Sequence, residues 1–502
     1  MRLKQLVVPV VLASGLAACG TTVPLAQQAA QGNGLDVVAG TGATSAPTGP
    51  AAPVAQGQVP GAAGGAAVGT GALATGAATP GSAVAAATSA AGGIATVGKG
   101  WDAKHVYLGV IVTTDAGSAL QALGVSINPG DEVGDARAIV ADLNRRGGLF
   151  GRQVVLTVKD DSSASVLSDP GAAGQADCAY FAQDHPVIGV VNTDASLDLE
   201  NFRGCFQHAR IPLVTTTTTA FDDTTGNQYA PYYYNALAVS WNRYADLFVQ
   251  HLKAQGWGGG WNPTTGTASP STPVKVGVYY GSSPASTRAG ALLLAALKRA
   301  GWATDSYQYS DPTQGSSAVL KFAADGVTHV VSDGSLFFFA TGARSQHFHP
   351  RFGVSTYDGP QALLDANGDH SQLAGAMGVG WYPTLDVDEA YDPGPGPGTA
   401  QCLLALKQGG QTFGGKRFAQ AFGMALCDGL RLAVLGAKAG GGLDPVSVRR
   451  GIVAMGASFP VGGSFGSGLS ATNYALPGAG RDLRWDPTVS SFRYVGGTFP
   501  IR

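Results

Sequence analysis

Hydroxyl, phenol and carboxyl side chains gather where apolar runs of this sequence end. The candidates are Thr193, Asp194, Thr217, Thr219, Tyr280, Asp333, Tyr357 and Asp358. If those runs are strands of open α/β sheets, these residues lie beyond the strands' carboxyl ends, where such sheets bind ligands. Thr and Ser at such positions also cap helices, and Asp also turns the chain. The pattern therefore indicates noncovalent binding of a small polar molecule, with capping and turning as the alternative roles.

Three other motifs suggest chemistry but lack the context that each requires. Gly462–Gly466 matches the letters of a nucleophile elbow, without a strand before it or a helix after it. Gly410–Lys416 has the spacing of a phosphate loop, but Arg417 stands where Ser or Thr must hold magnesium. His347 and His349 have no third metal ligand nearby in the sequence. We therefore expect no enzymatic activity, no cofactor and no metal, and an extracytoplasmic hydrolase is a minor alternative.

Two stretches with alternating strands and helices must position the candidate residues. The expected strands of the first stretch are 105–113, 153–159, 187–191 and 211–215, with helices at 132–146 and around Cys178 and Cys205. The second stretch has strands at 274–280, 328–332 and 352–356 and helices at 241–255, 288–300 and 335–343. Such alternation is typical of parallel sheets covered by helices on both faces. We predict an α/β protein with two doubly wound parallel sheets.

The chain then returns through 374–381 to further helices at 399–408, 416–436 and 446–455. A glycine-rich tail follows, in which 482–494 could form a hairpin.

The first 100 residues differ from the rest in composition. Arg2 and Lys4 precede an apolar run, 6–17, that is too short to span a bilayer and is typical of a cleaved export signal. Residues 20–100 are Ala-, Gly-, Thr- and Pro-rich and contain no aromatic residue. Such a segment cannot bury enough apolar surface to offset its ordering entropy. We predict a disordered tether over 19–100, with a reach of about 50 Å as a coil.

The charge content and the cysteines further limit the class of protein that this sequence can encode. Only 13% of residues are charged, the net charge is −2, and no cluster of Lys and Arg suggests nucleic-acid binding. Besides Cys19, the chain has four cysteines, and sequence proximity favours the pairs Cys178–Cys205 and Cys402–Cys427 among three possible pairings. Each disulfide would close a loop of about 25 residues and contribute ~3 kcal/mol. A zinc site is the alternative, although no CxxC spacing supports it.

The sequence Leu16-Ala17-Ala18-Cys19 resembles the lipobox of bacterial lipoproteins. The resemblance implies a signal peptide over 1–18, cleavage before Cys19 and a lipid on its thiol. The mature protein would then be extracytoplasmic and anchored to the bacterial cell membrane. An ordinary secretory signal with a chance cysteine is the alternative.

A second resemblance rests on residues around the second expected strand. They are Asp142-Leu143-Asn144, Gly147-Gly148, Gly151-Arg152 and Asp160-Asp161. Together they resemble the N-terminal lobe of type I periplasmic solute-binding proteins of branched-chain amino-acid ABC transporters. The resemblance runs from about 105 to 381 and implies two lobes with three chain crossings. Lobe one would be 101–239 plus 383–461, and lobe two 240–382 plus 462–502.

The same resemblance suggests roles for the candidate residues. Thr193, Thr217 and Thr219 would hold a ligand carboxylate in lobe one. Asp358, with Asp333 as second candidate, would hold the ligand ammonium in lobe two. In the family, the lobe-two tyrosine usually follows a short acidic loop after the first strand of that lobe. This chain differs, because Tyr279-Tyr280 come earlier and 281–284 replace that loop. A branched-chain amino acid is therefore not specified as the ligand.

We thus expect a lipid-anchored solute-binding protein that captures an amino acid or similar metabolite between its lobes and delivers it to an ABC permease. A ligand-sensing lipoprotein of the same fold, which signals to a membrane partner without transport, is the alternative.

Overall fold

The computed structural model describes residues 94–122, 127–334, 336–361, 364, 370–394 and 396–502. The predicted signal peptide, Cys19 and all but the last residues of the predicted tether lie outside these ranges.

The first sheet contains five parallel strands in the order β2-β1-β3-β4-β5. They are β1 (His105–Val112), β2 (Gln153–Asp160), β3 (Val190–Asn192), β4 (Leu213–Thr215) and β5 (Tyr233–Asn235). Apolar runs form the central strands, because a strand covered by helices on both faces is buried on both sides. The carboxyl ends of these strands lie at one edge of the sheet and carry the Thr and Asp loops.

Six of the described helices before Tyr233 connect or cover this sheet. They are α2 (Ala116–Ala122), α3 (Glu132–Arg145), α4 (Ser163–Ser168), α5 (Pro170–Ala179), α6 (Glu200–Ala209) and α7 (Asp223–Gln228). The Asp131 side chain caps α3 by accepting a hydrogen bond from the Gly134 N–H at 2.8 Å. Gly147 and Gly148 follow the helix with φ of 94° and 61°, which glycine adopts without steric cost.

Three later helices return to the first sheet. These are α14 (Pro397–Gln408), α15 (Arg417–Gly440) and α16 (Pro445–Met455). Helices α14 and α15 pack on α3, and α15 also contacts β3 and β4. Helix α15 is the one described helix long and apolar enough to cross a membrane, but 78% of its apolar window is buried inside the protein. We therefore interpret α15 as a core helix. Disulfides join Cys178 to Cys205 and Cys402 to Cys427, the pairings that sequence proximity favours.

The second sheet has seven strands in the order β14-β13-β12-β11-β10-β8-β9. They are β8 (Lys275–Gly281), β9 (Ala303–Tyr309), β10 (His329–Ser332), β11 (Arg351–Ser355), β12 (Met377–Gly380), β13 (Ala479–Asp486) and β14 (Ser491–Pro500). Strands β8 to β12 are parallel, and the C-terminal hairpin β13–β14 adds antiparallel to β12. The hairpin expected within 482–494 therefore forms and extends one edge of this sheet. A separate short hairpin, β6 (Trp261–Asn262) with β7 (Thr267–Ala268), lies in the Gly/Pro/Thr-rich loop before β8.

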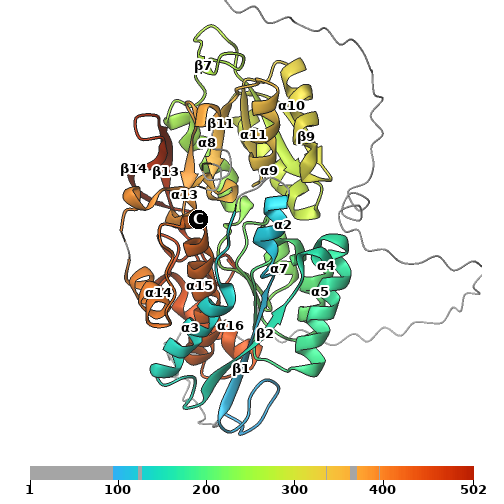
Figure 1. Cartoon of the computed structure of the whole chain (residues 1–502), viewed down its shortest axis with the longest axis vertical. Helices are drawn as coiled ribbons and strands as arrows, with labels where there is room; N and C mark the ends of the chain where they lie inside the picture. The colour runs from blue at the N-terminus through green and yellow to red at the C-terminus, as the bar shows by residue number, and fades with distance from the viewer. Residues whose placement is uncertain (1–93, 123–126, 335, 362–363, 365–369, 395) are drawn as a thin grey trace, which may run out of the picture. The chain divides into compact units, whose positions relative to one another are not determined.

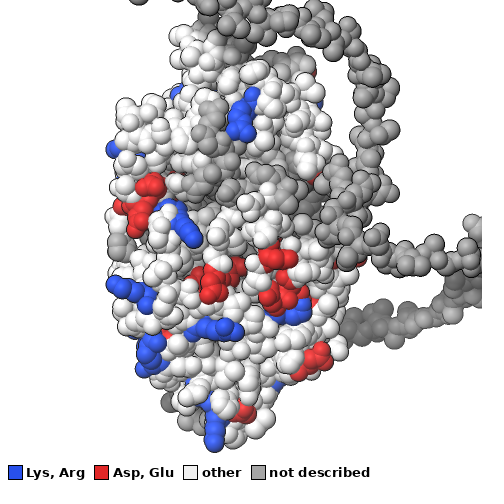
Figure 2. All heavy atoms as spheres, in the orientation of Figure 1, with Lys and Arg blue, Asp and Glu red and all other residues white. Residues whose placement is uncertain are grey.

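The helices of the second sheet are α8 (Trp241–Ala254), α9 (Pro284–Arg299), α10 (Gly315–Ala324) and α11 (Leu336–Ser345), and the short α13 (Pro383–Asp386) follows β12. In Figure 1 these elements occupy the upper half of the view, whereas β1, β2, α3 and α14–α16 occupy the lower half. On the face drawn in Figure 2, the described basic side chains do not gather into one patch, and some of them lie beside acidic side chains.

An aromatic cluster joins the segments where the chain passes between the two sheets. Trp241 stacks on Tyr357 with ring centroids 4.9 Å apart, and Trp381 meets Tyr357 edge-on at 5.1 Å. The Trp381 indole donates a hydrogen bond to the Leu237 carbonyl at 2.8 Å, and the Tyr357 hydroxyl donates to the Val239 carbonyl. All three rings are almost completely buried. We call Trp241, Tyr244, Tyr357 and Trp381 the hinge cluster.

Candidate ligand-binding cleft

Three adjoining cavities lie beyond the carboxyl ends of the parallel strands. Two of them are lined from both sheets, and the third is lined by loops and helices of the first sheet alone. The central cavity, of about 210 Å³, is lined by Thr193 and 216–218 from the first sheet's loops and by Gly334 and 357–359 from the second sheet's loops. Helices α11 and α15 contribute Phe337, Phe338, Phe418 and Phe422. The outer cavity, of about 360 Å³, shares Ala195, Thr218 and Gly334 with it. The apolar cavity, of about 250 Å³, shares Thr193, Ala195, Phe418 and Phe422 with it.

Every candidate residue except Tyr280 lines one of these cavities. The Tyr280 ring instead lies against Gly290 of α9, where an added Cβ would come within 2.6 Å of the ring. Successive side chains of a strand point to opposite faces, so Tyr279 points the other way and stacks on Tyr309 at 4.5 Å. The expectation that Tyr280 contacts ligand is therefore not supported by its position.

Thr193 and Asp194 follow β3 and are held by neighbouring groups of the same sheet. The Thr193 N–H and hydroxyl both donate to the Ile111 carbonyl at 3.2 Å. Asp194 accepts hydrogen bonds from the Thr113 hydroxyl at 2.5 Å and from the Ser196 N–H at 2.7 Å. Asp194 therefore positions the loop after β3, and the Thr193 hydroxyl is directed at an internal acceptor.

Thr217 and Thr219 follow β4, and their hydroxyls are 2.9 Å apart. The Thr219 hydroxyl donates to Asp198 at 2.8 Å. Asp198 is also bound by Arg203 at 2.6 Å and by the Tyr233 hydroxyl at 2.8 Å. The buried Arg203 guanidinium is paired with the Asp198 carboxylate. This ion pair therefore offers no uncompensated positive charge to a ligand in the cleft. The threonine hydroxyls expected to hold a ligand carboxylate are thus already partnered.

Asp358 lines the central cavity from the loop after β11. Its carboxylate accepts hydrogen bonds from the Ser332 hydroxyl, from the Ser355 N–H at 2.7 Å and from the Ser355 hydroxyl at 3.0 Å. Burial raises the pKa of Asp358 to about 7. Asp358 therefore combines a position beside the cavity with a capping role in the turn over 356–358.

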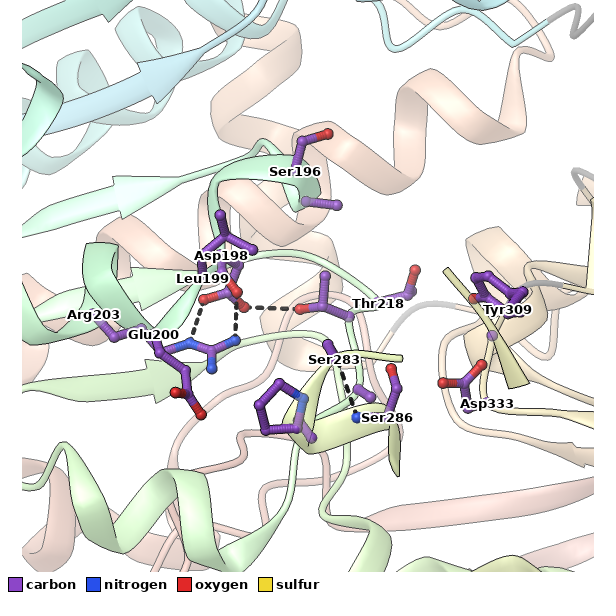
Figure 3. Close-up of a pocket in the computed structure, with 16 residues that line it drawn as sticks. Ser196, Asp198, Leu199, Glu200, Arg203, Thr218, Ser283, Ser286, Tyr309 and Asp333 are labelled. Carbon is purple, nitrogen blue, oxygen red and sulfur yellow. Dashed lines mark hydrogen bonds and ion pairs between the residues drawn. The ribbon is translucent and has the colours of Figure 1, made fainter. Parts of the chain in front are cut away.

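Asp333 lines the outer cavity after β10. Burial raises the pKa of its carboxyl to about 6, and one oxygen accepts a hydrogen bond from the Gly281 N–H at 3.2 Å. Its Oδ1 atom has no hydrogen-bond partner among the described residues. Figure 3 shows Asp333 beside Tyr309 on one side of the cavity, with Asp198 and Arg203 on the opposite side.

Glu132, Phe418 and Phe422 are cleft residues that the sequence did not reveal. Glu132 occupies the first turn of α3, where an acidic residue ordinarily complements the helix dipole. Phe418 and Phe422 lie one turn apart on α15 and match an ordinary apolar helix face. In the sequence, these three residues cannot be distinguished from residues that serve only the structure. Within the described ranges, no group of three or more His, Cys, Asp or Glu side chains is placed to hold a metal ion.

No family model matches the chain, and no curated protein matches it. Solved structures do match. A branched-chain amino-acid ABC transporter protein from Thermus thermophilus with bound valine is 14% identical, with a TM-score of 0.56, over 79% of this chain and 96% of that one. A solute-binding protein from Rhodopseudomonas palustris HaA2 in complex with p-hydroxybenzoic acid is 13% identical, with a TM-score of 0.57, over 80% and 98%.

A third similar structure is an ABC transporter substrate-binding protein from Desulfitobacterium hafniense in complex with leucine. It is 13% identical, with a TM-score of 0.52, over 78% of this chain and all of that one. The chain therefore has the fold of the type I periplasmic solute-binding proteins, as the sequence resemblance implies.

Proposed function

We propose that this protein captures a small solute between two lobes and presents it to a membrane partner. The observation that carries the proposal is the central cavity, whose walls come from the carboxyl-edge loops of both sheets. A ligand held there contacts both halves and can stabilise a closed arrangement more than an open one. Valine, leucine and p-hydroxybenzoate in the similar structures are consistent with such a role. We assign lobe one to 101–239 plus 383–461 and lobe two to 240–382 plus 462–502.

The partner in this proposal is an ABC permease, and the lipid on Cys19 would hold the protein at the extracytoplasmic face of the cell membrane. Such a tether raises the effective concentration of the binding body near its partner. We propose no enzymatic activity, because the similar structures are those of solute-binding proteins.

Thermal denaturation with a panel of neutral, cationic, anionic and zwitterionic metabolites tests solute capture. A ligand that binds only the folded state stabilises it by about 2.7 kcal/mol at a concentration of 100 Kd. We expect at least one small solute to raise the melting temperature and to reduce the radius of gyration measured by X-ray scattering. A panel without a single stabilising member would contradict solute capture.

A salt bridge between the proposed lobes provides a second test. Arg288 of α9 binds the buried Asp222 carboxylate, which caps α7, and donates to the Thr225 hydroxyl at 3.1 Å. Because this contact joins the two lobes, Arg288→Ala should favour their separation. We expect the affinity for a stabilising ligand to fall about tenfold, which corresponds to ~1.4 kcal/mol.

Arg299→Ala is the matched control for Arg288→Ala. Arg299 pairs with Asp246 at 2.5 Å inside lobe two, and both side chains are 58% exposed. Exposed pairs of this kind contribute little, so calorimetry should give the wild-type affinity for this variant. Equal affinities of the two variants would show that the Arg288 contact does not bias closure.

A further inference from the structure

The apolar cavity combines apolar walls with polar lining residues, of which Glu132 and Asp194 are the charged ones. Ile127, Val166, Leu167, Phe418 and Phe422 form much of its wall, and Glu132 faces it from the first turn of α3. A cavity with an apolar body and a few polar groups matches a ligand of the same build. Because the apolar and central cavities share walls, a ligand in one lies directly beside the other.

Glu132 is short of hydrogen-bond donors. Its side chain belongs to a residue only 5% exposed, and Oε1 has no hydrogen-bond partner within the described ranges. The Thr193 hydroxyl lies near the carboxyl group but also donates to the Ile111 carbonyl. A buried acceptor without a donor costs about 1–3 kcal/mol. The fold tolerates this cost at a residue that faces a cavity, where a bound molecule can supply the missing donor.

The groups around Glu132 favour a cation. Asp135, Asp160 and Asp194 lie near enough to raise the pKa of Glu132 further, although burial is the main cause of its rise to about 7. Asp358 adds a carboxyl group on the opposite wall of the central cavity. No Lys, Arg or His is among the described residues that line the apolar or central cavity.

A ligand carboxylate would find few free hydrogen-bond donors in the cleft. The Thr193 and Thr219 hydroxyls donate to the Ile111 carbonyl and to Asp198, so neither is free to receive an anion in this arrangement. The aromatic walls also suit a cation, because ring faces attract ammonium groups. An acid or an amino acid would therefore place its carboxylate among carboxyl groups without a compensating cation.

We propose that the cleft selects a primary amine with an apolar body and no carboxylate, whose ammonium group donates to Glu132 Oε1 while its body packs against Phe418 and Phe422. The proposal rests on the proposed function and specifies the class of solute. It differs from the expectation that an amino-acid carboxylate is held by Thr193, Thr217 and Thr219.

Three probes with the same ring test this selection on the purified protein. They are 2-phenylethylamine, phenylalanine and 3-phenylpropionate, compared by calorimetry at pH 7. We expect 2-phenylethylamine to bind at least tenfold more tightly than phenylalanine, and 3-phenylpropionate not to bind. Equal or tighter binding of phenylalanine or 3-phenylpropionate would overturn the inference and leave solute capture intact.

Glu132→Gln identifies the group that holds the ammonium. The change preserves side-chain size, so we expect at least a tenfold loss of affinity for 2-phenylethylamine while the melting temperature without ligand stays at or above that of the wild type. Glu389→Gln is the control, because Glu389 is an exposed first-turn glutamate that lines none of the three cavities. A folded Glu132→Gln variant with wild-type affinity would overturn the assignment. Failure of every solute class to bind would overturn the proposed function as well.

Discussion

Lowering the pH from 7.5 to 5.5 is expected to stabilise the folded protein. The cause is a set of buried carboxyl groups whose pKa burial raises. The pKa is about 7 for Glu132, Asp135, Asp177, Asp358 and Asp386, and about 6 for Asp333 and Asp428. Unfolded carboxyl groups titrate near pH 4. Between about pH 4 and 7 the folded state therefore binds more protons than the unfolded state.

This difference sets the sign of the effect. The stabilisation is fully present below about pH 4 and is lost as the pH rises through 6 to 7, so the free energy of unfolding increases on acidification across this window. His329 acts in the opposite direction, because burial lowers its pKa to about 4 and it must gain a proton on unfolding. The effect of His329 thus opposes that of the seven carboxyl groups. Each group changes the free energy of unfolding by up to about 1.4 kcal/mol per pH unit. We expect a net gain of ~3 kcal/mol or more.

Urea denaturation at pH 5.5, 6.5 and 7.5 measures this dependence. Asp135→Asn provides an internal control, because both oxygens of Asp135 are buried without hydrogen-bond partners among the described residues. The variant should show a shallower dependence of unfolding free energy on pH than the wild type. A wild-type protein that loses stability steadily from pH 7.5 to 5.5 would contradict the raised pKa values.

Replacement of Trp381 by alanine is expected to have the largest effect of any single substitution considered. Trp381 is 0% exposed, packs edge-on against Tyr244 at 5.0 Å and against Tyr357 at 5.1 Å, and donates to the Leu237 carbonyl. The variant loses the buried ring and leaves a cavity. The Leu237 carbonyl also loses its hydrogen-bond donor. Large-to-small core changes of this kind cost about 3–5 kcal/mol. The free energy of unfolding from urea titration should fall by that amount.

Leu404→Ala is the comparison for Trp381→Ala. Leu404 lies on α14 and is 47% exposed, so its truncation should change the unfolding free energy by less than about 0.5 kcal/mol. Trp381→Phe should recover part of the lost stability, because it restores ring packing without the indole N–H. A Trp381→Ala variant as stable as Leu404→Ala would show that the hinge cluster does not hold the crossing segments together.

Sequence patterns predict the elements that are long and strongly periodic. The apolar run of β1 and the helical apolar face of α3 are of this kind, and both form at the predicted positions. The sequence does not predict strand β9, because ATDSYQY is a polar edge strand with little apolar alternation. Strand β5 has only three residues, too few for a periodic signal.

The site was harder to predict than the fold, because contacts between distant residues decide it. The strand ends predict where a cleft could lie, and all candidates but Tyr280 line cavities there. The bond from Thr219 to Asp198 links residues 21 positions apart and has no sequence signature. Glu132 looks like an ordinary first-turn glutamate, and only its burial beside a cavity distinguishes it.

The C-terminal hairpin has a consequence for the order in which the protein can be completed during synthesis. Strand β14 is the last strand of the chain and covers β13, which in turn covers the edge of β12. Helix α15, which packs on β3 and β4, also comes late. The first sheet therefore lacks a neighbour until Gly440 has been made, and the second sheet lacks its last described strand until Pro500 has been made. Until then a nascent chain exposes the unpaired edge of β12, the kind of strand edge that pairs with other chains and aggregates.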